Sequence, residues 1–535
     1  MLGDGGLFPE GWDTSRDLLV VIGRGADALL EQLAAQGQRR VFVYLPEEAS
    51  GTRVPQAARL VHSPMDLFDG VLALRRPLPK RVVVQRQPDP WVSDEVHGEV
   101  SRTVEESLRA RRLRVAKLDR HGPGWLAQAM EALPEVARHG SVAALDGAFA
   151  KRPCFIASPG PSLEKNAALL RDVKGRAVIA ASTHALAPLQ AQGVVPDLVL
   201  AAGPEERLLR HYSGVDLSGV EALLVGATCH RGHWEQGARR HLSFANGDQL
   251  DDWIHRPYRE DARLASGGSV ACSAVSLALR MGCDPIVFLG QDLAFDGDRY
   301  YSPSSVDAEA RIEPSEDGHS FRLLDPARGG EAEPQQMVKV MGYKGGLVLT
   351  SETFRSYLVW LETLARSREG RTMFINCTEG GANIRGMQHR PLADVVPAYV
   401  RADVAVGDVL DQRLAGLDLG ERRRQTIASA ELILGGIEPC LELAARCRVL
   451  AGEARSDAGR LDALQDAERE LTTALRSARF LSMLAPREIL AAQERVQAAR
   501  TLEQNLAAAQ DLFELVERSG GTLHGPLAAA LAELR

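Results

Sequence analysis

Short apolar runs alternate with amphipathic stretches over the first part of the chain. Leu18–Ile22 and Arg40–Leu45 have the length and β-branched content of buried parallel strands, and Ala26–Gln36 between them has the apolar spacing of a helix. Arg81–Val84 is a further strand candidate. Because strand, helix and strand follow one another, we expect a Rossmann-like N-terminal domain over residues 1–150.

The alternation becomes stronger after Pro153. The apolar runs that we expect to form strands, separated by helical segments and turn residues, are Cys154–Ala157, Ala177–Ala181, Leu198–Ala201, Ala222–Val225, Leu242–Ala245, Ile286–Leu289 and Met373–Ile375. They predict a doubly wound, mostly parallel sheet that forms a catalytic domain over residues 151–400. Ser302–Gln336 is rich in acidic residues, Pro, Ser and Gly, and predicts a long mobile or lid-like loop.

Strand patterns are absent after about Asp403. Leu and Ala recur at helical spacing in four stretches, Glu421–Leu434, Glu438–Ala451, Leu461–Leu484 and Arg487–Ser519. Gly435-Gly436 with Pro439, and Pro486, are expected to separate these helices. The fold class expected for the whole chain is therefore α/β, with an all-α C-terminal bundle over residues 401–535 that serves packing or homo-oligomerisation.

Composition narrows the class of protein. The 535 residues are 45% hydrophobic and 25% charged, with a formal net charge of -8, and no apolar run is long enough to cross a bilayer. Basic residues occur only in short clusters, so nucleic acid is not the expected partner. Seven scattered cysteines and the lack of a signal peptide favour a reducing, cytoplasmic location.

The first candidate for chemistry is the turn Gly23-Arg24-Gly25, which follows a strand and opens a helix. Such glycines allow a close approach to a phosphate at a helix N-terminus, and Glu47 or Glu48 after the next strand could bind a ribose. Asp27, however, would face the anion unfavourably. We therefore favour a structural turn over a dinucleotide or S-adenosylmethionine site.

Ser158-Pro159-Gly160-Pro161-Ser162 also lies between a strand and a helix. Ser162 is placed as a helix N-cap, and Gly160 can bring the backbone close to a ligand. The motif is either a capped turn or a cradle for a nucleotide phosphate. It lacks the lysine of a Walker A loop, which disfavours an ATPase of that class.

Two further groups of residues lie at the ends of predicted strands or at helix starts. Ser266-Gly267-Gly268-Ser269 precedes a helix of small residues, and we favour ligand binding for it. Gln291 and Asp292 follow the Ile286–Leu289 strand, where ligand-orienting or catalytic carboxylates often lie, unless Asp292 only caps the next element. Tyr300 and Tyr301 could donate to a phosphate, whereas Asp296 and Asp298 lack the other ligands of a calcium loop.

The last group, Thr378-Glu379-Gly380-Gly381, follows the final strand. Cys377 next to it has no adjacent histidine and is expected to be a buried structural thiol. Cys229-His230 with His233 lacks the second ligand pair of a zinc site. No metal is therefore expected.

In this order, the motifs resemble those of the bacterial motility-associated factor glycosyltransferases. These share a domain with archaeal 6-hydroxymethylpterin pyrophosphokinases and are distantly similar to bacterial sialyltransferases. The resemblance covers Cys154 to about Leu392, and the residues that carry it are Gly160-Pro161-Ser162-Leu163, Pro196-Asp197, Gly267-Gly268-Ser269-Val270, Gly290-Gln291-Asp292-Leu293-Ala294 and Thr378-Glu379-Gly380-Gly381-Ala382.

The resemblance implies transfer of a nonulosonic acid of the pseudaminic, legionaminic or sialic type from a CMP-sugar donor to Ser or Thr of flagellin, with no tightly bound cofactor. It implies that the nucleotide meets the turns at Gly160–Leu163 and Gly267–Ser269, and that Tyr300 assists departure of the phosphate, with Asp292 as the second catalytic candidate. The related sialyltransferases have a histidine base. Near Gly342–Thr350 this chain offers Tyr343, Lys344 and Thr350, so no base is assigned.

Family members carry an acidic residue where this chain has Gly203, and Glu205 is a possible substitute. The alternatives are a pyrophosphokinase that moves diphosphate from Mg-ATP to a hydroxymethylpterin, or a non-catalytic scaffold that keeps the fold. Magnesium is expected only under the first alternative, which the absence of that acidic residue disfavours.

Overall fold

A computed structural model describes residues 12–24, 26–45, 58–74, 78–246, 253–265, 267–326, 334–478, 495 and 500–535. Gly25, Glu47, Glu48, Ser266 and Pro486 lie outside these ranges, so the predictions made for them are not addressed.

The N-terminal sheet is parallel, with the strand order β3-β2-β1-β4. Its apolar strands pack on helices on both faces, as a strand–helix–strand pattern requires. The elements are β1 (Leu18–Ile22), α1 (Asp27–Ala35), β2 (Val41–Tyr44), β3 (Ala58–Val61), α2 (Pro64–Leu72) and β4 (Val82–Arg86).

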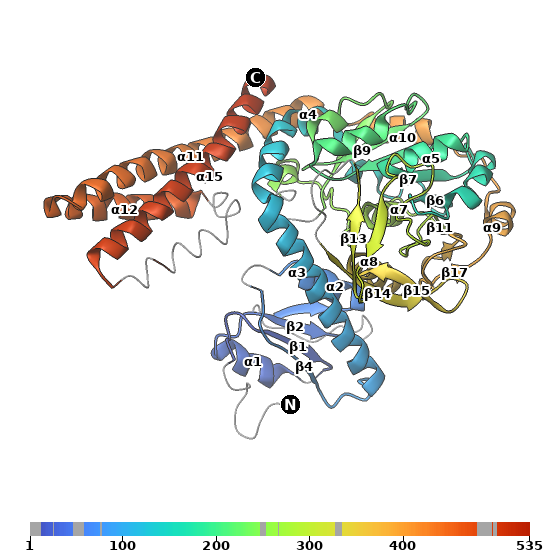
Figure 1. Ribbon diagram of the computed structural model, residues 1–535, viewed down its shortest axis with the longest axis horizontal. Helices are drawn as coiled ribbons and strands as arrows, with labels where there is room; N and C mark the ends of the chain where they lie inside the picture. Colours follow the sequence, from blue (N-terminus) through green and yellow to red (C-terminus); the bar gives the residue numbers. More distant parts are fainter. Residues whose placement is uncertain are drawn as a thin grey trace.

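A long helix that the sequence analysis did not predict joins this sheet to the rest of the molecule. Helix α3 (Asp94–Glu131) begins at Ser93, whose hydroxyl accepts a hydrogen bond from the Val96 amide, and α4 (Leu133–Arg138) follows it. Figure 1 shows α3 crossing from the N-terminal sheet to α4 beside the central domain. Its N-terminal half packs on the N-terminal sheet through Val100, Val104 and Leu108.

The central sheet is parallel along all its described strands, in the order β17-β16-β11-β6-β7-β8-β9-β10-β5. From β6 the chain builds outward to β10 on one side, and then returns to place β11 on the other side of β6. The order therefore reverses between β6 and β11, which is where open α/β sheets bind ligands at the carboxyl ends of the strands. The strands are β5 (Gly140–Ser141), β6 (Cys154–Ala157), β7 (Val178–Ser182), β8 (Leu198–Ala201), β9 (Ala222–Gly226), β10 (His241–Phe244), β11 (Ile286–Leu289), β16 (Phe374–Asn376) and β17 (Gln388–His389).

Helices cover both faces of the central sheet. One face packs on α7 (Val270–Arg280), α8 (Glu352–Ser367) and α10 (Val406–Leu414), and part of the other on α9 (Leu392–Tyr399). Helix α5 (Leu186–Ala191) follows β7, and short 3₁₀ turns follow several strands; the ones used below are Thr183–Ala185, Glu206–Tyr212 and Arg231–His233. The predicted α/β class is confirmed.

The segment Ser302–Gln336 was predicted to be a loop, and this is wrong for much of its described part. β12 (Arg311–Pro314) and β13 (Ser320–Leu324) pair in antiparallel fashion, and β14 (Gln335–Met341) and β15 (Leu347–Ser351) extend the same sheet. Ile312, Phe321 and Leu323 are buried in a small core with Phe295. Alternating apolar positions within a polar segment explain the hairpin.

The C-terminal region is helical, but Gly435, Gly436 and Pro439 do not separate two helices as predicted. α11 (Leu419–Ala454) runs through all three residues and packs on α12 (Leu461–Ser477) and α15 (Leu502–Leu534). Burial of the α11 face against α15 outweighs the low helix propensity of these positions. At Gly520 an added Cβ would lie 2.4 Å from Leu441 Cδ2, so glycine permits the close approach of the two helices.

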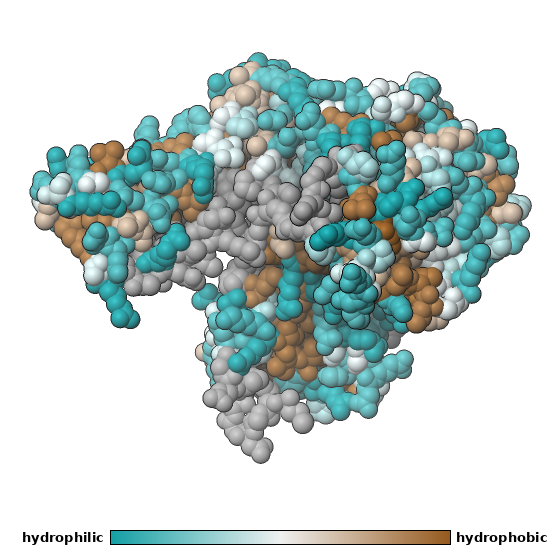
Figure 2. Space-filling model, viewed as in Figure 1, coloured by the Kyte–Doolittle hydropathy of each residue, from teal (hydrophilic) through white to brown (hydrophobic). Residues whose placement is uncertain are grey.

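The C-terminal helices project away from the central domain (Figure 1). Their base shares a hydrophobic core with α4 and with one face of β8 and β9. Figure 2 shows apolar residues scattered among hydrophilic ones on this projection, and Leu432 on α11 is 79% exposed. None of the helices in the described ranges combines the length and apolar content that crossing a bilayer requires.

Candidate functional site

Three predicted motifs meet at the carboxyl edge of β6, β11 and β16. The Ser158 hydroxyl donates to Gln291 Oε1 at 2.5 Å, and the Gln291 amide donates to Thr378 Oγ1 at 3.2 Å. The Ala382 amide donates to the carbonyl of Asp292 at 2.7 Å. The loops after these three strands therefore form one hydrogen-bonded unit at the position where the strand order reverses, which we call the switch-point edge.

Glycines allow these loops to pack directly on one another. A Cβ added at Gly160 would lie 2.0 Å from Asp292 Oδ2, and one at Gly381 would lie 2.2 Å from the Asp292 carbonyl oxygen. Gly290 and Gly381 have φ angles of 62° and 69°, which favour glycine. At Gly380 an added Cβ would lie 3.0 Å from Lys165 Nζ. Gly160, Gly380 and Gly381, which were predicted to bind a ligand, thus bring one loop against another, as Gly290 does.

Asp292 is buried, and its carboxylate contacts Ser162. Oδ2 accepts from the Ser162 hydroxyl at 2.7 Å and from the Ser162 amide at 3.2 Å. Burial raises the pKa of Asp292 to about 6, against the opposing effect of these two hydrogen bonds. The carboxylate holds the Gly160–Ser162 turn on β11, and its catalytic role stays a prediction.

Ser162 lies at the predicted N-cap position, but the element that follows is a 3₁₀ turn and the Ser162 side chain makes no capping hydrogen bond. Its hydroxyl instead donates across the edge to Asp292, because the short turn lets the two loops approach. Pro161 beside it is buried. The carboxylate of Glu379 accepts from the Asn166 amide at 2.7 Å and from the Leu392 amide at 3.2 Å.

Gly267, Gly268 and Ser269 lie at the start of α7, on one face of the same sheet. Ser269 caps the helix by accepting from the Ala271 amide at 3.2 Å. Gly267 and Gly268 have φ angles of 49° and 94°, and added Cβ atoms would meet Trp360 and Tyr357. Since α7 runs back from the carboxyl edge, its N-terminus is close to the ends of the strands that it covers.

Tyr300 and Tyr301 lie next to these turns. The Tyr300 ring packs on Phe354, with 4.7 Å between centroids, and Phe354 packs on Tyr357. Ser302, the next residue, donates from its amide to Pro159 O at 2.9 Å and from its hydroxyl to Glu164 Oε1 at 2.8 Å. The tyrosines are therefore tied to the loop after β6, and the role predicted for Tyr300 stays a prediction.

Buried polar atoms without a hydrogen-bond partner occur at this edge. Among the described residues these include Ser182 Oγ at the end of β7, Asn376 Nδ2 at the end of β16, and Asn166 Oδ1. Ser182 shares a strand face with Val178 and Ala180, which pack in the same core as α7. Buried polar groups normally have partners, so such atoms are candidates for ligand contact.

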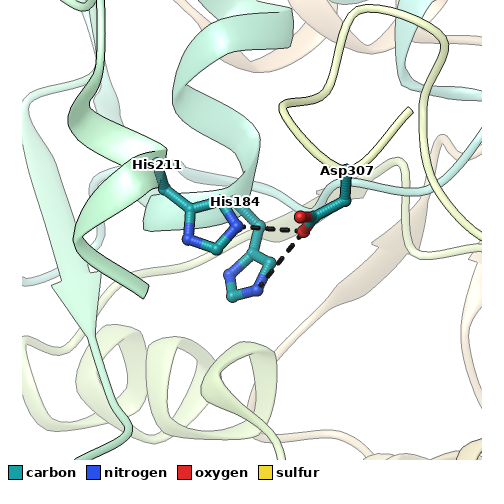
Figure 3. A group of neighbouring side chains, drawn as sticks. All are labelled: His184, His211 and Asp307. Atoms are coloured by element: carbon teal, nitrogen blue, oxygen red, sulfur yellow. Dashed lines mark hydrogen bonds and ion pairs between the residues drawn. The ribbon is translucent and has the colours of Figure 1, made fainter. Parts of the chain in front are cut away.

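A cluster that the sequence analysis missed lies at the same edge. His184 follows β7, His211 lies in the turn after β8, and Asp307 comes from the segment after β11 (Figure 3). His211 Nε2 is 2.9 Å and His184 Nε2 3.8 Å from Asp307 Oδ2. The His184 ring centroid is 6.0 Å from that of Tyr301.

Burial and the neighbouring His211 lower the pKa of His184 to about 3. Burial opposes ionisation of Asp307, but the His211 hydrogen bond and nearby positive charges outweigh it and lower its pKa to about 2. The sequence signal that could have indicated this cluster is that two histidines follow neighbouring strands. Asp307 could not be placed, because it lies in a segment that was predicted to be a loop.

An acidic side chain at Gly203 would be strained in this conformation. Its φ angle is 131°, and an added Cβ would lie 2.3 Å from Leu208 Cδ1. Glu205 Oε2 would lie 3.1 Å from the same Cβ, so a carboxylate from two residues later occupies the neighbouring space. This agrees with Glu205 as a substitute for the acidic residue.

Asp197 has a structural role at the opposite edge of the sheet. It precedes β8, accepts from the Ile179 amide at 2.8 Å and pairs with Lys174 at 2.6 Å. A cleft of about 1150 Å³ also lies toward that amino edge, lined by charged groups such as Asp69, Lys151 and Asp284. It does not coincide with the motifs.

At the N-terminal turn, Asp89 occupies the place of an anionic ligand. Its carboxylate accepts from the Arg24 amide at 2.9 Å and from Arg24 Nε at 3.0 Å, and the Arg24 hydrogen bond lowers the pKa of Asp89 to about 2. The Gly23 Cα faces Gln87, Asp89 and Val92. This arrangement agrees with a structural turn.

The sulfur and imidazole candidates contact other groups. Burial raises the pKa of Cys377 to about 12, as expected for a structural thiol. His233 Nδ1 bonds the Tyr212 hydroxyl at 2.7 Å, whereas His230 Nδ1 accepts from the Gly232 amide and Cys229 donates to Ala201 O. All seven cysteines are buried, and none of them forms a disulfide.

Known proteins resemble this chain in its central region. Residues 127–298, which include β5 to β11, match the family model described as 6-hydroxymethylpterin diphosphokinase MptE-like. An uncharacterized protein of Treponema pallidum (strain Nichols) is 34% identical over 125 residues, which cover 21% of this chain and 32% of that protein. The chain thus matches about a third of the length of this relative.

Among solved structures, the MAf glycosyltransferase from Magnetospirillum magneticum AMB-1 aligns over 97% of this chain and 79% of its own, with 15% identity and a TM-score of 0.41. A likeness this distant carries no functional argument. The family match includes the motifs after β6, before α7 and after β11, whereas Thr378–Gly381 lies beyond it. The central region of this chain is therefore similar to the MptE-like family, which confirms the shared domain that the order of the motifs predicts.

Proposed function

We propose that the chain is a glycosyltransferase that moves a nonulosonic acid from a CMP-sugar to a Ser or Thr hydroxyl of a protein, with flagellin as the acceptor that the motif resemblance implies. The observation that carries the proposal is the joining of the motif loops at the switch-point edge, where Asn166, Ser182 and Asn376 keep buried polar atoms without partners. A nucleotide offers both donors and acceptors to such atoms.

The reaction would break the bond between the anomeric carbon and the CMP phosphate oxygen as the acceptor oxygen bonds to that carbon. The acceptor proton would pass to a general base, and CMP would leave with the added negative charge. Lys165 lies beside this edge, with its ammonium 3.4 Å from the Glu379 carbonyl oxygen, and Tyr300 and Tyr301 are beside it as well. Such groups stabilise a leaving phosphate.

A protein acceptor is consistent with the C-terminal helices. They project from the central domain (Figure 1), and α11 exposes Leu432 and Val449 on a largely polar surface. A small acceptor would need no such projection.

The second candidate is transfer of diphosphate from Mg-ATP to a hydroxymethylpterin, which the description of the matching family favours. Magnesium requires free carboxylate oxygens. Glu164, Asp292 and Glu379 follow β6, β11 and β16, and each accepts hydrogen bonds from protein groups through one of its two oxygens. The acidic residue that the resemblance expects is missing at Gly203, and this disfavours the magnesium-dependent reaction.

Calorimetric titration of the full chain with CMP, and separately with ATP and Mg²⁺, tests the choice. We expect heat of binding with CMP, and release of CMP when a CMP-nonulosonate and an acceptor protein are supplied together. Binding of ATP with Mg²⁺ but not of CMP would support the diphosphokinase. If neither nucleotide binds, the non-catalytic scaffold becomes the better account.

A further inference from the structure

The cluster of His184, His211 and Asp307 has no part in the function proposed above. Three segments that are far apart in sequence bring it together (Figure 3). One ligand atom from each residue can be chosen so that all three lie within 4.8 Å of one another. The side chains of His211 and Asp307 are 1% and 3% exposed, and that of His184 is 21% exposed.

Two of the three ligand-atom distances are close to those between ligands of one metal ion. Metal–ligand bonds of about 2.0–2.1 Å in a tetrahedral site place neighbouring ligand atoms about 3.3 Å apart. The Asp307 Oδ2 to histidine nitrogen distances of 2.9 and 3.8 Å lie on either side of this value. Small side-chain adjustments would therefore suffice.

The contacts of His211 suit a bound metal cation. Nδ1 lies 2.8 Å from the Leu208 carbonyl oxygen and Nε2 lies 2.9 Å from Asp307 Oδ2, so both ring nitrogens face oxygen acceptors. A neutral imidazole has one N–H and satisfies only one of them, whereas an imidazolium, or a neutral ring with a metal cation at Nε2, satisfies both. With a metal cation between Nε2 and Asp307, Nδ1–H donates to the carbonyl, as in many metal-binding histidines.

Arg210 orients the carboxylate. It pairs with Asp307 through Oδ1, which leaves Oδ2 directed at the histidines, and it also lies 3.5 Å from Asp325. Asp325 offsets part of the charge of Arg210, and Arg207 is a second cation near His184. His184 is the most exposed member, and the fourth coordination position would therefore open on its side.

We propose that His184, His211 and Asp307 bind one divalent transition-metal cation of the Zn²⁺ type, with an open position for water or a phosphate oxygen. Two imidazoles and one carboxylate suit Zn²⁺ or Co²⁺, whereas Mg²⁺ and Ca²⁺ select oxygen ligands. The site stands apart from the glycosyltransferase proposal, because it rests on these side chains alone.

The test is calorimetric titration of chelator-treated, tag-free full-length chain with Zn²⁺, without nucleotide, together with the visible spectrum of Co²⁺. We expect one equivalent bound and a four-coordinate Co²⁺ spectrum. His184→Ala and Asp307→Asn should each weaken Zn²⁺ binding by about 100-fold or more, because losing a ligand costs more than the roughly 10–100-fold loss from an outer-shell change. Thermal melting checks that His184→Ala, a change at a partly exposed residue, remains folded.

His230→Ala is the matched control, because His230 lies outside the cluster and accepts only from the Gly232 amide among its described contacts. It should bind Zn²⁺ as the unaltered chain does. The proposal is overturned if the unaltered chain binds no Zn²⁺, if folded His184→Ala and Asp307→Asn both retain it, or if His230→Ala loses as much affinity as they do. Failure to bind CMP would leave the metal result unaffected.

Discussion

Two parallel sheets in this molecule place a glycine turn after a central strand, yet the two turns differ in what surrounds them. In the N-terminal sheet, the turn after β1 contacts Asp89, which follows β4. The Asp89 carboxylate pairs with the exposed side chain of Arg24. In the central sheet, the turn after β6 contacts Asp292, which follows β11. The buried Asp292 carboxylate accepts hydrogen bonds from Ser162. In both turns, a carboxylate of the chain contacts a backbone amide that an anionic ligand could use.

The difference shows that a glycine turn alone does not identify a site. Asp89 has a lowered pKa because of Arg24, whereas burial raises that of Asp292. His184, His211 and the buried Ser182 hydroxyl lie at the ends of β7 and β8, on the side of β6 away from β11. The candidate reactive groups lie after the strands next to β6, whereas the glycines determine how closely the loops pack.

The largest expected difference in stability is between glycine variants of the two turns. Gly381→Ala places a Cβ against the Asp292 backbone at a positive φ, and should lower the free energy of unfolding by about 4 kcal/mol, the sum of the left-handed and overpacking costs. Gly23→Ala meets only side chains, at 3.1–3.2 Å, and should lose about 2 kcal/mol. Urea unfolding measures both. Gly37→Ala, in open space at a φ of 78°, is the control for the backbone cost. Equal losses of unfolding free energy at Gly381 and Gly23 would mean that the loops of the central sheet pack no more tightly than those of the N-terminal sheet.

The two carboxylates should have opposite effects on the pH dependence of stability. Asp292 has a folded-state pKa of about 6, above its unfolded value of 3.8, so its contribution is full below pH 4 and is lost as pH rises through 6. Two pKa units correspond to about 3 kcal/mol. The unfolding free energy of the unaltered chain relative to Asp292→Asn should therefore fall by about that amount between pH 4 and pH 7.

Asp89 should have the opposite effect on the pH dependence of stability. Its folded-state pKa of about 2 lies below 3.8, so its contribution is present above pH 4 and is lost as pH falls toward 2. Relative to Asp89→Asn, the unaltered chain should be more stable at pH 5 than at pH 3. If both variants change the pH profile in the same direction, the electrostatic contrast between the turns is wrong.

The smallest effect is expected for Arg24→Ala. The Arg24 side chain is 58% exposed, and exposed ion pairs contribute at most about 1 kcal/mol. The Asp89 carboxylate keeps its bond from the backbone amide of residue 24. CMP affinity, measured by calorimetry, should not change. A loss of CMP binding would place the nucleotide at the N-terminal turn.

Sequence patterns predicted the strands well, because buried parallel strands are short, apolar and bounded by turns. Leu18–Ile22, Cys154–Ala157, Leu198–Ala201 and Ile286–Leu289 have the predicted bounds. Helix α3 and the hairpin β12–β13 were missed because their polar sequences obscure the periodicity. The continuity of α11 through Pro439 depends on packing against α15, which local propensity does not reveal.

The positions of the loops that form the candidate site could be predicted from the sequence, but the contacts between their side chains could not. The positions after β6, β11 and β16 follow from the rule that parallel strands expose their carboxyl ends at one edge. That Ser162 bonds Asp292, or that Asp307 meets His184 and His211, depends on loop conformations that no local pattern encodes. The location of the edge therefore follows from the strand pattern, whereas the contacts of its side chains do not.

CMP binding to two matched serine variants tests the central claim most directly. The Ser182 hydroxyl is buried without a partner among the described residues, whereas the Ser243 hydroxyl on β10 of the same sheet donates to Gly140 O at 3.2 Å. We predict that Ser182→Ala weakens CMP binding about tenfold without lowering the melting temperature, since one ligand hydrogen bond contributes about 1.4 kcal/mol. Ser243→Ala should lower the melting temperature and leave CMP affinity unchanged. Unaltered CMP affinity in Ser182→Ala, or equal losses in both variants, would contradict a nucleotide site at the switch-point edge.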